Sequence, residues 1–135
     1  MPSTLSLLSL LSLLSLLSLL LRFYPVSQGA LCIDGQPIAS LDEEAFRDAV
    51  GLVPQEPFLF DGTIAANLLF ADPALGRADL QRAIEVLDLG DWFDTLPEGL
   101  DTPVGQRGTQ LSAGERQLVA LVRASLIDPA VLVLD

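Results

Sequence analysis

The last third of the chain contains a helix start that could bind an anion. Ser112 can cap the first turn, and Glu115 follows three residues later, which is the spacing of a reciprocal capping box. Gly114 lies between them and has no side chain to block close approach to the backbone. Such a start leaves backbone N–H groups and the positive end of the helix dipole pointing outward. It therefore predicts an anion-binding site.

A short apolar run follows this helix. Asp128-Pro129 is expected to end the helix, because the residue before a proline avoids the helical region. Residues 131–134 are then all apolar, which predicts a strand buried on both faces, as in a parallel sheet. Asp135 comes directly after them. Open α/β sheets bind ligands at this end of their strands, and a carboxylate there is suited to hold Mg²⁺.

The order of these motifs resembles that of the ATP-binding cassette (ABC) ATPases. The signature motif of that family is similar to Leu111-Ser112-Ala113-Gly114-Glu115, although glycine is usual at position 113 and glutamine is common at position 115. Residues 131–135 resemble the Walker B strand. Gln55, which follows the apolar residues 50–53 and Pro54, resembles the glutamine of the Q-loop. Taken singly, each piece could also be an ordinary capped helix, a core strand or a polar strand end.

The resemblance implies a role for each of these residues. Gln55 and Asp135 are the implied catalytic residues, and both approach the Mg²⁺ that accompanies ATP. Residues 111–115 would meet the ATP that a second nucleotide-binding domain holds in a head-to-tail pair. Residues 102–108 match the exporter pattern Thr-x-Val-Gly-x-x-Gly. The transmembrane domains of an exporter, which the loop after Gln55 would also contact, are thus implied partners at the cytoplasmic face of the plasma (inner) membrane.

The other segments predict an α/β fold, namely a partial P-loop NTPase-like ABC ATPase core with an antiparallel β segment and a helical subdomain over about residues 63–125. Asp34-Gly35 between apolar runs predicts a hairpin. Ser40 or Asp42 can cap a helix that ends at residue 49, and Thr63 can cap a shorter one.

An amphipathic helix is predicted over residues 77–89. Its apolar face carries Leu80, Ile84 and Leu87, and Gly90 is expected to end it.

The amino-terminal segment is a low-complexity repeat. Residues 6–20 are Ser-Leu-Leu five times over, which predicts a helix that is apolar on every side. We separate residues 1–21, the repeat helix, from residues 22–135, the partial ABC domain. The repeat could be an expansion inside the helix that follows the family's phosphate loop, a membrane or targeting segment, or an interaction helix. It has no basic start or cleavage site, and residues 5–21 are marginal for a span of about 20 residues.

The resemblance also implies that parts of the catalytic set are missing. Pro2 stands where the lysine of the phosphate loop (Walker A) is expected, and the chain stops one residue before the position of the family's catalytic glutamate. We therefore expect the ATP-binding part of an exporter-type ABC transporter, here as an incomplete fragment that does not hydrolyse ATP alone. The alternatives are a non-catalytic cassette that contributes only its signature helix to a partner, and a membrane-associated interaction protein.

The amino-acid composition excludes several functional classes. Eighteen acidic against seven basic residues give a net charge of −11, which argues against a nucleic-acid surface. The chain has no histidine and one cysteine, which excludes histidine catalysis, an internal disulfide framework and a cysteine-rich zinc site. Cys32, between two apolar residues, and Tyr24, after the repeat helix, are predicted to be packing residues.

Overall fold

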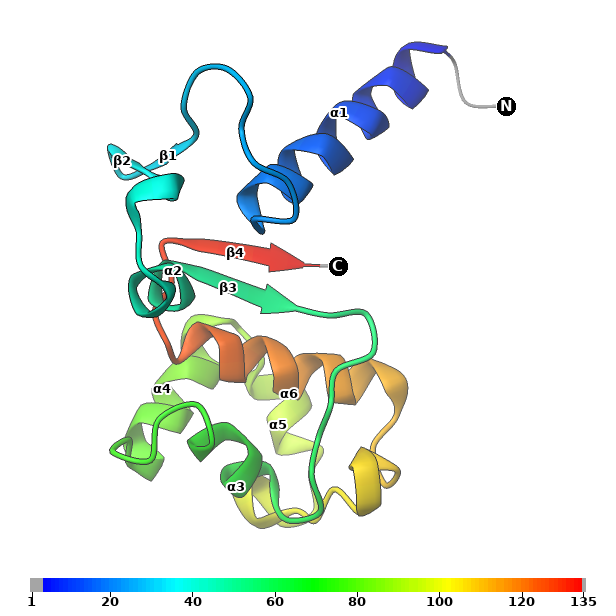
Figure 1. The fold of residues 1–135 in the computed structure, drawn as a ribbon. Coiled ribbons are helices and arrows are strands. Elements are labelled where there is room, and N and C mark those ends of the chain that lie inside the picture. The colour runs from blue at the N-terminus through cyan, green and yellow to red at the C-terminus, as the bar shows by residue number, and fades with distance from the viewer. Residues whose placement is uncertain (1–3, 135) are drawn as a thin grey trace.

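The structure is a computed structural model that describes residues 4–134, with side chains described from Leu11 onward. The elements are α1 (Thr4–Leu20), β1 (Cys32–Ile33), β2 (Gln36–Pro37), η1 (Ile38–Ser40), α2 (Glu43–Ala49), β3 (Val50–Val53), α3 (Ile64–Leu69), α4 (Arg77–Val86), α5 (Gly90–Asp94), η2 (Gly99–Asp101), η3 (Gln106–Gly108), α6 (Ala113–Ser125) and β4 (Val131–Leu134). The helices and strands form a layered arrangement, in which the strand pair lies between the repeat helix on one side and helices α3 to α6 on the other (Figure 1).

Two small sheets organise the chain. Strands β1 and β2 form the predicted antiparallel hairpin, and its two turn residues, Asp34 and Gly35, have φ of 48° and 80°. These left-handed values are what the tight turn of a two-residue hairpin needs. Strands β3 and β4 pair in parallel, from Val50 opposite Val131 to Val53 opposite Leu134. The carboxyl ends of both strands therefore meet at the same edge.

The main apolar core lies among α3, α4, α6 and the segments between them. Its most deeply buried side chains are at most 2% exposed: Leu59, Ile64, Leu68, Leu80, Ile84, Val104, Val119 and Val122. Full burial of one such side chain contributes about 1.5–3 kcal/mol, so this cluster is the main source of stability for the helical part. Leu80 and Ile84 are the inward residues that the α4 periodicity predicted.

The strand pair has a separate cluster on each face. Val50 and Val133 pack with Leu17, Leu20 and Leu21 at the end of α1. The opposite face contacts α6, through Val53 and the partly buried Leu132. The prediction that residues 131–134 are buried on both faces is wrong at Leu134, which is 62% exposed, and Leu52 in the neighbouring β3 is 46% exposed. The described sheet has only these two strands, and the helices on each side cover only part of it.

Three local predictions are wrong. Cys32 is exposed, because alternation in the short β1 strand turns Ile33 inward instead. Tyr24 is 67% exposed, since the chain turns away from the body after α1. Helix α4 ends at Val86, and the left-handed residue that follows is Asp88, with φ of 57°, rather than Gly90. Gly90 instead begins α5.

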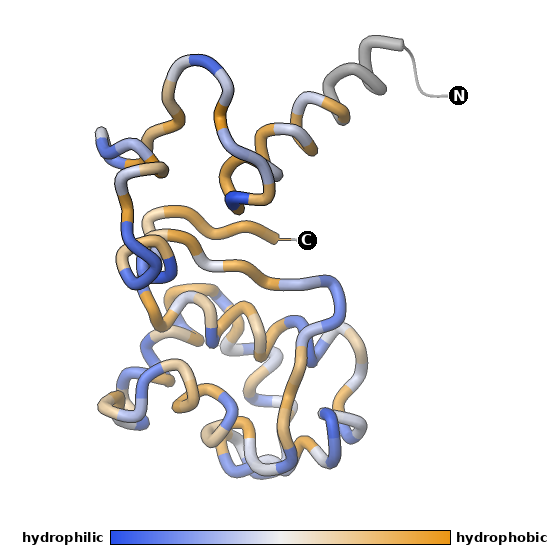
Figure 2. Tube along the Cα trace, viewed as in Figure 1, coloured by the Kyte–Doolittle hydropathy of each residue, from blue (hydrophilic) through white to orange (hydrophobic). Residues whose placement is uncertain are grey.

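The repeat helix extends away from the rest of the molecule (Figures 1 and 2). Leu11, Leu13, Leu14 and Leu16 are 48–59% exposed. At about 100° per residue, these four side chains lie on different sides of the helix, as predicted for an all-apolar repeat. Within residues 4–134, no helix combines the length and the apolar character that crossing a membrane would need.

Candidate functional site

The start of α6 is built as the sequence predicts. The backbone N–H of Glu115 donates to Ser112 Oγ at 3.1 Å, and the backbone N–H of Ser112 donates to Glu115 Oε1 at 3.1 Å. Ser112 has extended backbone angles, which are those of an N-cap residue. The two bonds close a capping box and satisfy two backbone donors that would otherwise lack partners at the helix start.

The tip itself is open. Ser112, Ala113 and Gly114 are exposed, whereas Leu111 is only 6% exposed and anchors the tip in the main core. Among the described residues, the N–H groups of Ala113 and Gly114 have no acceptor. A Cβ atom at Gly114 would meet nothing closer than Ser112 Oγ at 4.0 Å. Glycine is therefore not required there by the chain's own packing, and its absent side chain leaves the amides accessible from outside.

Trp92 also contacts this tip. Its indole Nε1–H donates to the second carboxylate oxygen of Glu115, Oε2, at 3.1 Å. The Ser112 N–H first and the Trp92 indole second hold the pKa of the Glu115 carboxyl below its ordinary value. Nothing in the sequence indicates this contact, because Trp92 belongs to a different helix, α5, 23 residues upstream.

The exporter-like segment before the signature is a tightly built connector. Gly105 and Gly108 have φ of 77° and 72°. A Cβ atom at Gly108 would lie 2.9 Å from Arg116 Cδ and 3.0 Å from Leu59 Cδ1. Arg116 Nη1 donates to the carbonyl of Leu111 at 2.8 Å, so the helix fixes the residue that precedes its own cap. Both glycines are thus needed for the path that leads the chain into the signature.

Gln55 lies in an exposed loop after β3, and the backbone of this loop is held by other elements. Gln117 Nε2 donates to the Gln55 carbonyl at 2.8 Å, and Arg123 Nη1 donates to the Phe58 carbonyl at 3.1 Å. The Gln55 side chain is left free of partners among the described residues. Burial lowers the pKa of the Arg123 guanidinium, although this group remains charged at neutral pH.

Asn67 fixes the far end of the same loop. It is fully buried, its Oδ1 accepts from the Phe60 N–H at 3.1 Å, and its Nδ2 donates to the carbonyls of Phe60 and Thr63 at 3.1 and 3.0 Å. The roles of Asn67, Gln117 and Arg123 are not visible in the sequence, because nothing in it shows which backbone groups a polar side chain will reach.

Two of the predicted site regions come together. A groove of about 470 Å³ is lined by Gln55 and Phe58 on one side and by Ala113 and Arg116 of the signature region on the other. Asp135, the predicted Walker B carboxylate, lies outside the described residues. Leu134 before it pairs with Val53, two residues before Gln55. Within residues 4–134, no three metal-ligating side chains form a cluster.

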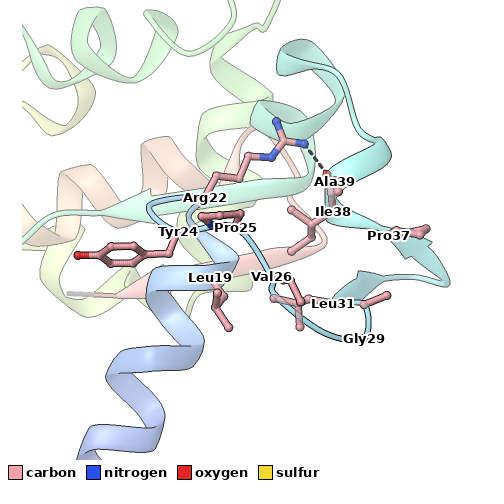
Figure 3. Close-up of a pocket in the computed structure, with 11 residues that line it drawn as sticks. Leu19, Arg22, Tyr24, Pro25, Val26, Gly29, Leu31, Pro37, Ile38 and Ala39 are labelled. Carbon is pink, nitrogen blue, oxygen red and sulfur yellow. Dashed lines mark hydrogen bonds between the residues drawn. The ribbon is translucent and has the colours of Figure 1, made fainter.

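A second cavity, of about 460 Å³, lies away from these residues, between the end of α1 and the β1–β2 hairpin (Figure 3). Its lining is mostly apolar, and it includes the exposed Tyr24. Arg22 is its one charged lining residue: the guanidinium lies 4.2 Å from the centre of the Phe46 ring and donates to the carbonyls of Ile38 and Leu41. These contacts engage the guanidinium in fastening α1 to α2, and none of the predicted site residues lines this cavity.

An exposed, capped helix tip favours anions, and parallel strands are typical of α/β proteins, whose ligands bind at the carboxyl ends of the strands. The family model described as "ABC transporter" matches residues 15–135, and the chain belongs to this family. It corresponds to part of an exporter-type nucleotide-binding domain, which is an ATP-binding domain with the α/β fold of P-loop NTPases.

Known proteins support the exporter type. The chain is 40% identical over 116 residues to the ABC multidrug transporter mdr2 of Aspergillus fumigatus, covering 86% of this chain and 14% of the relative. It is equally identical, over the same length and share of this chain, to the ATM1-type heavy metal exporter of Novosphingobium aromaticivorans, of which 19% is covered.

A solved structure also supports the exporter type. The ATP-bound form of a bacterial Atm1-family ABC exporter superposes with a TM-score of 0.73 at 39% identity, covering 90% of this chain and 21% of that one. The chain thus spans only a small part of the length of the exporters that it matches.

Proposed function

We propose that this chain presents its signature helix to ATP that a second ABC domain holds in a head-to-tail pair. The observation that carries the proposal is the exposed tip at residues 112–114, where the N–H groups of Ala113 and Gly114 have no acceptor among the described residues. Amides at a helix start, together with the helix dipole, favour a bound phosphate group. ATP would then join the two domains, because the tip of this chain would complete the site of the second domain.

The tip offers donors of the right kind. Ser112 Oγ already accepts the N–H of Glu115, so its own hydroxyl hydrogen is free to donate to a phosphate oxygen. The amides of Ala113 and Gly114 add two further donors on the same side of the helix start. The carboxylate of Glu115 accepts hydrogen bonds from Ser112 and Trp92, which limits its repulsion of an incoming anion.

We further propose that Gln55 and Asp135 hold the Mg²⁺ of the nucleotide. Their oxygen atoms are the ligands that this hard cation prefers. The Gln55 side chain suits the role because Gln117 contacts only its backbone carbonyl, so the side-chain oxygen stays available. When bound, Mg²⁺ neutralises phosphate charge during phosphoryl transfer.

The surface around Phe58 is the proposed contact with the transmembrane domains of an exporter, at the cytoplasmic face of the membrane. Phe58 is 66% exposed, while Leu59 beside it is fully buried and fixes the backbone. An aromatic side chain presented on a fixed backbone loses little entropy on binding, which favours it as an interface anchor.

The proposal is tested by mixing the chain with an intact ABC domain, such as that of the Novosphingobium exporter, and measuring ATP turnover against the intact domain alone. We expect the chain to raise ATP turnover by the intact domain. Ser112→Arg should lower this gain about 100-fold, which is the order of the loss when one positioned donor is removed. Ser27→Arg, at an exposed loop position, is the matched control and should leave the gain intact. Equal gains with both variants would refute donation through the tip.

A further inference from the structure

The helix that carries the signature tip also holds the loop that carries Gln55 and Phe58. Gln117 and Arg123, both on α6, donate to the carbonyls of Gln55 and Phe58. These bonds span 62 and 65 residues of sequence, so they are tertiary contacts rather than local turns. The two donors are six residues apart, or about 9 Å along the helix at ~1.5 Å per residue. The loop therefore runs along α6 and is attached to it at two points.

The loop is also anchored by side chains of its own. Glu56 and Phe58 are exposed, whereas Pro57 and Leu59 are buried, and Asn67 binds the backbone of Phe60. The start of the loop at Gln55 and Glu56 is exposed, and Gln117 holds it through the Gln55 carbonyl. The carbonyl of Phe58 depends on Arg123, whose planar guanidinium is an oriented donor.

We propose that Gln117 and Arg123 are positioning residues that make residues 55–58 follow the signature helix. ATP engaged at Ser112 would then also fix the surface around Phe58. The effect of ATP in this inference rests on the proposed function. The attachment of the loop to the helix rests on the two observed hydrogen bonds. A helix is rigid over the five residues that separate Ser112 from Gln117, so a shift of the tip displaces the Gln55 carbonyl by a similar amount.

The test uses hydrogen–deuterium exchange of the full chain, and it separates two segments: the tip at residues 113–116 and the loop at residues 54–60. Gln117→Glu keeps the side-chain size and removes the donor, and Arg123→Gln removes the guanidinium. Gln81→Glu, on the exposed face of α4, is the matched control. We expect each of the two variants to speed exchange in the loop about fivefold, the factor for one net hydrogen bond, and α4 to stay unchanged. Arg123→Lys, which keeps a donor and the charge, should restore part of the protection.

The same measurement with the intact Novosphingobium domain and Mg-ATP distinguishes the two proposals. In the unaltered chain, protection of the tip should be accompanied by protection of the loop. In the Gln117→Glu/Arg123→Gln double variant, the tip should still be protected and the loop should not. No protection of the tip in the unaltered chain would overturn the proposed function. Protection of the loop in the double variant, or faster exchange spread evenly through α4 as well, would overturn the positioning role.

Discussion

The indole Nε1 of Trp92 lies 3.1 Å from Glu115 Oε2, and this contact joins α5 to the signature tip. The other carboxylate oxygen accepts the N–H of Ser112, so both oxygens of Glu115 face a donor. A glutamine, which is common at this signature position, would have one oxygen and one donating amide group there. Glutamate at position 115 is thus matched to the tryptophan at position 92.

Glu115→Gln is expected to destabilise the chain by about 1 kcal/mol, because the new amide group would face either the Ser112 N–H or the Trp92 N–H, donor against donor. Urea unfolding followed by fluorescence measures this directly, since Trp92 is the only tryptophan in the chain. Glu85→Gln, on the exposed side of α4, makes the same chemical change without a hydrogen-bond partner among the described residues. Equal unfolding midpoints for the two variants would mean that the contact adds nothing.

The same contact predicts a dependence of stability on acid. The folded-state pKa of Glu115 is lowered by the Ser112 N–H and then by Trp92. A carboxyl with a lowered folded pKa stabilises the folded state above its unfolded pKa of about 4.3, and this stabilisation is lost as the pH falls through the folded value. Trp92→Phe should therefore reduce the loss of stability below about pH 4.3. Unfolding midpoints followed by circular dichroism from neutral pH to pH 3 measure it, and identical pH profiles would contradict the prediction.

Local sequence chemistry determined what could be predicted. The Asp34-Gly35 turn, the caps at Asp42, Thr63 and Ser112, and the apolar spacing of α4 each depend on a few neighbouring residues, and all are found in the structure.

What could not be predicted depends on residues far apart in the chain. Whether Leu134 or Cys32 is buried depends on which elements cover the strands, and the partners of Trp92, Gln117 and Asn67 depend on the folded path of the backbone. Helix α4 ends at Val86, three residues before the predicted end at residue 89, and the left-handed residue after it is Asp88 rather than a glycine.

Asn67→Leu is expected to cost about 2–4 kcal/mol, because it leaves the partly buried N–H and carbonyl of Phe60 without the partners that the buried Asn67 supplies. Leucine has the same number and branching of side-chain non-hydrogen atoms and is larger than asparagine, so a cavity does not account for the loss. Chemical denaturation gives the free energy of unfolding. Gln81→Leu, the same kind of change on the exposed face of α4, should stay within about 0.5 kcal/mol. A cost as small for Asn67→Leu would show that Phe60 finds other partners.

Gly108→Ala is expected to destabilise the chain by about 1–3 kcal/mol. The new Cβ would lie 2.9 Å from Arg116 Cδ and 3.0 Å from Leu59 Cδ1, at a residue whose φ of 72° already disfavours a side chain. Arg116 can shift, but doing so disturbs its bond to the Leu111 carbonyl, so the variant should also weaken donation of the tip to a partner domain.

Gly90→Ala is the matched control, since nothing lies within 4 Å of its Cβ position and it begins α5. That variant should be neutral or should stabilise by up to about 1 kcal/mol, because alanine favours helix more than glycine does. Thermal unfolding of both variants measures the difference in stability. A Gly108→Ala variant as stable as Gly90→Ala would mean that the connector can adopt another path into the signature.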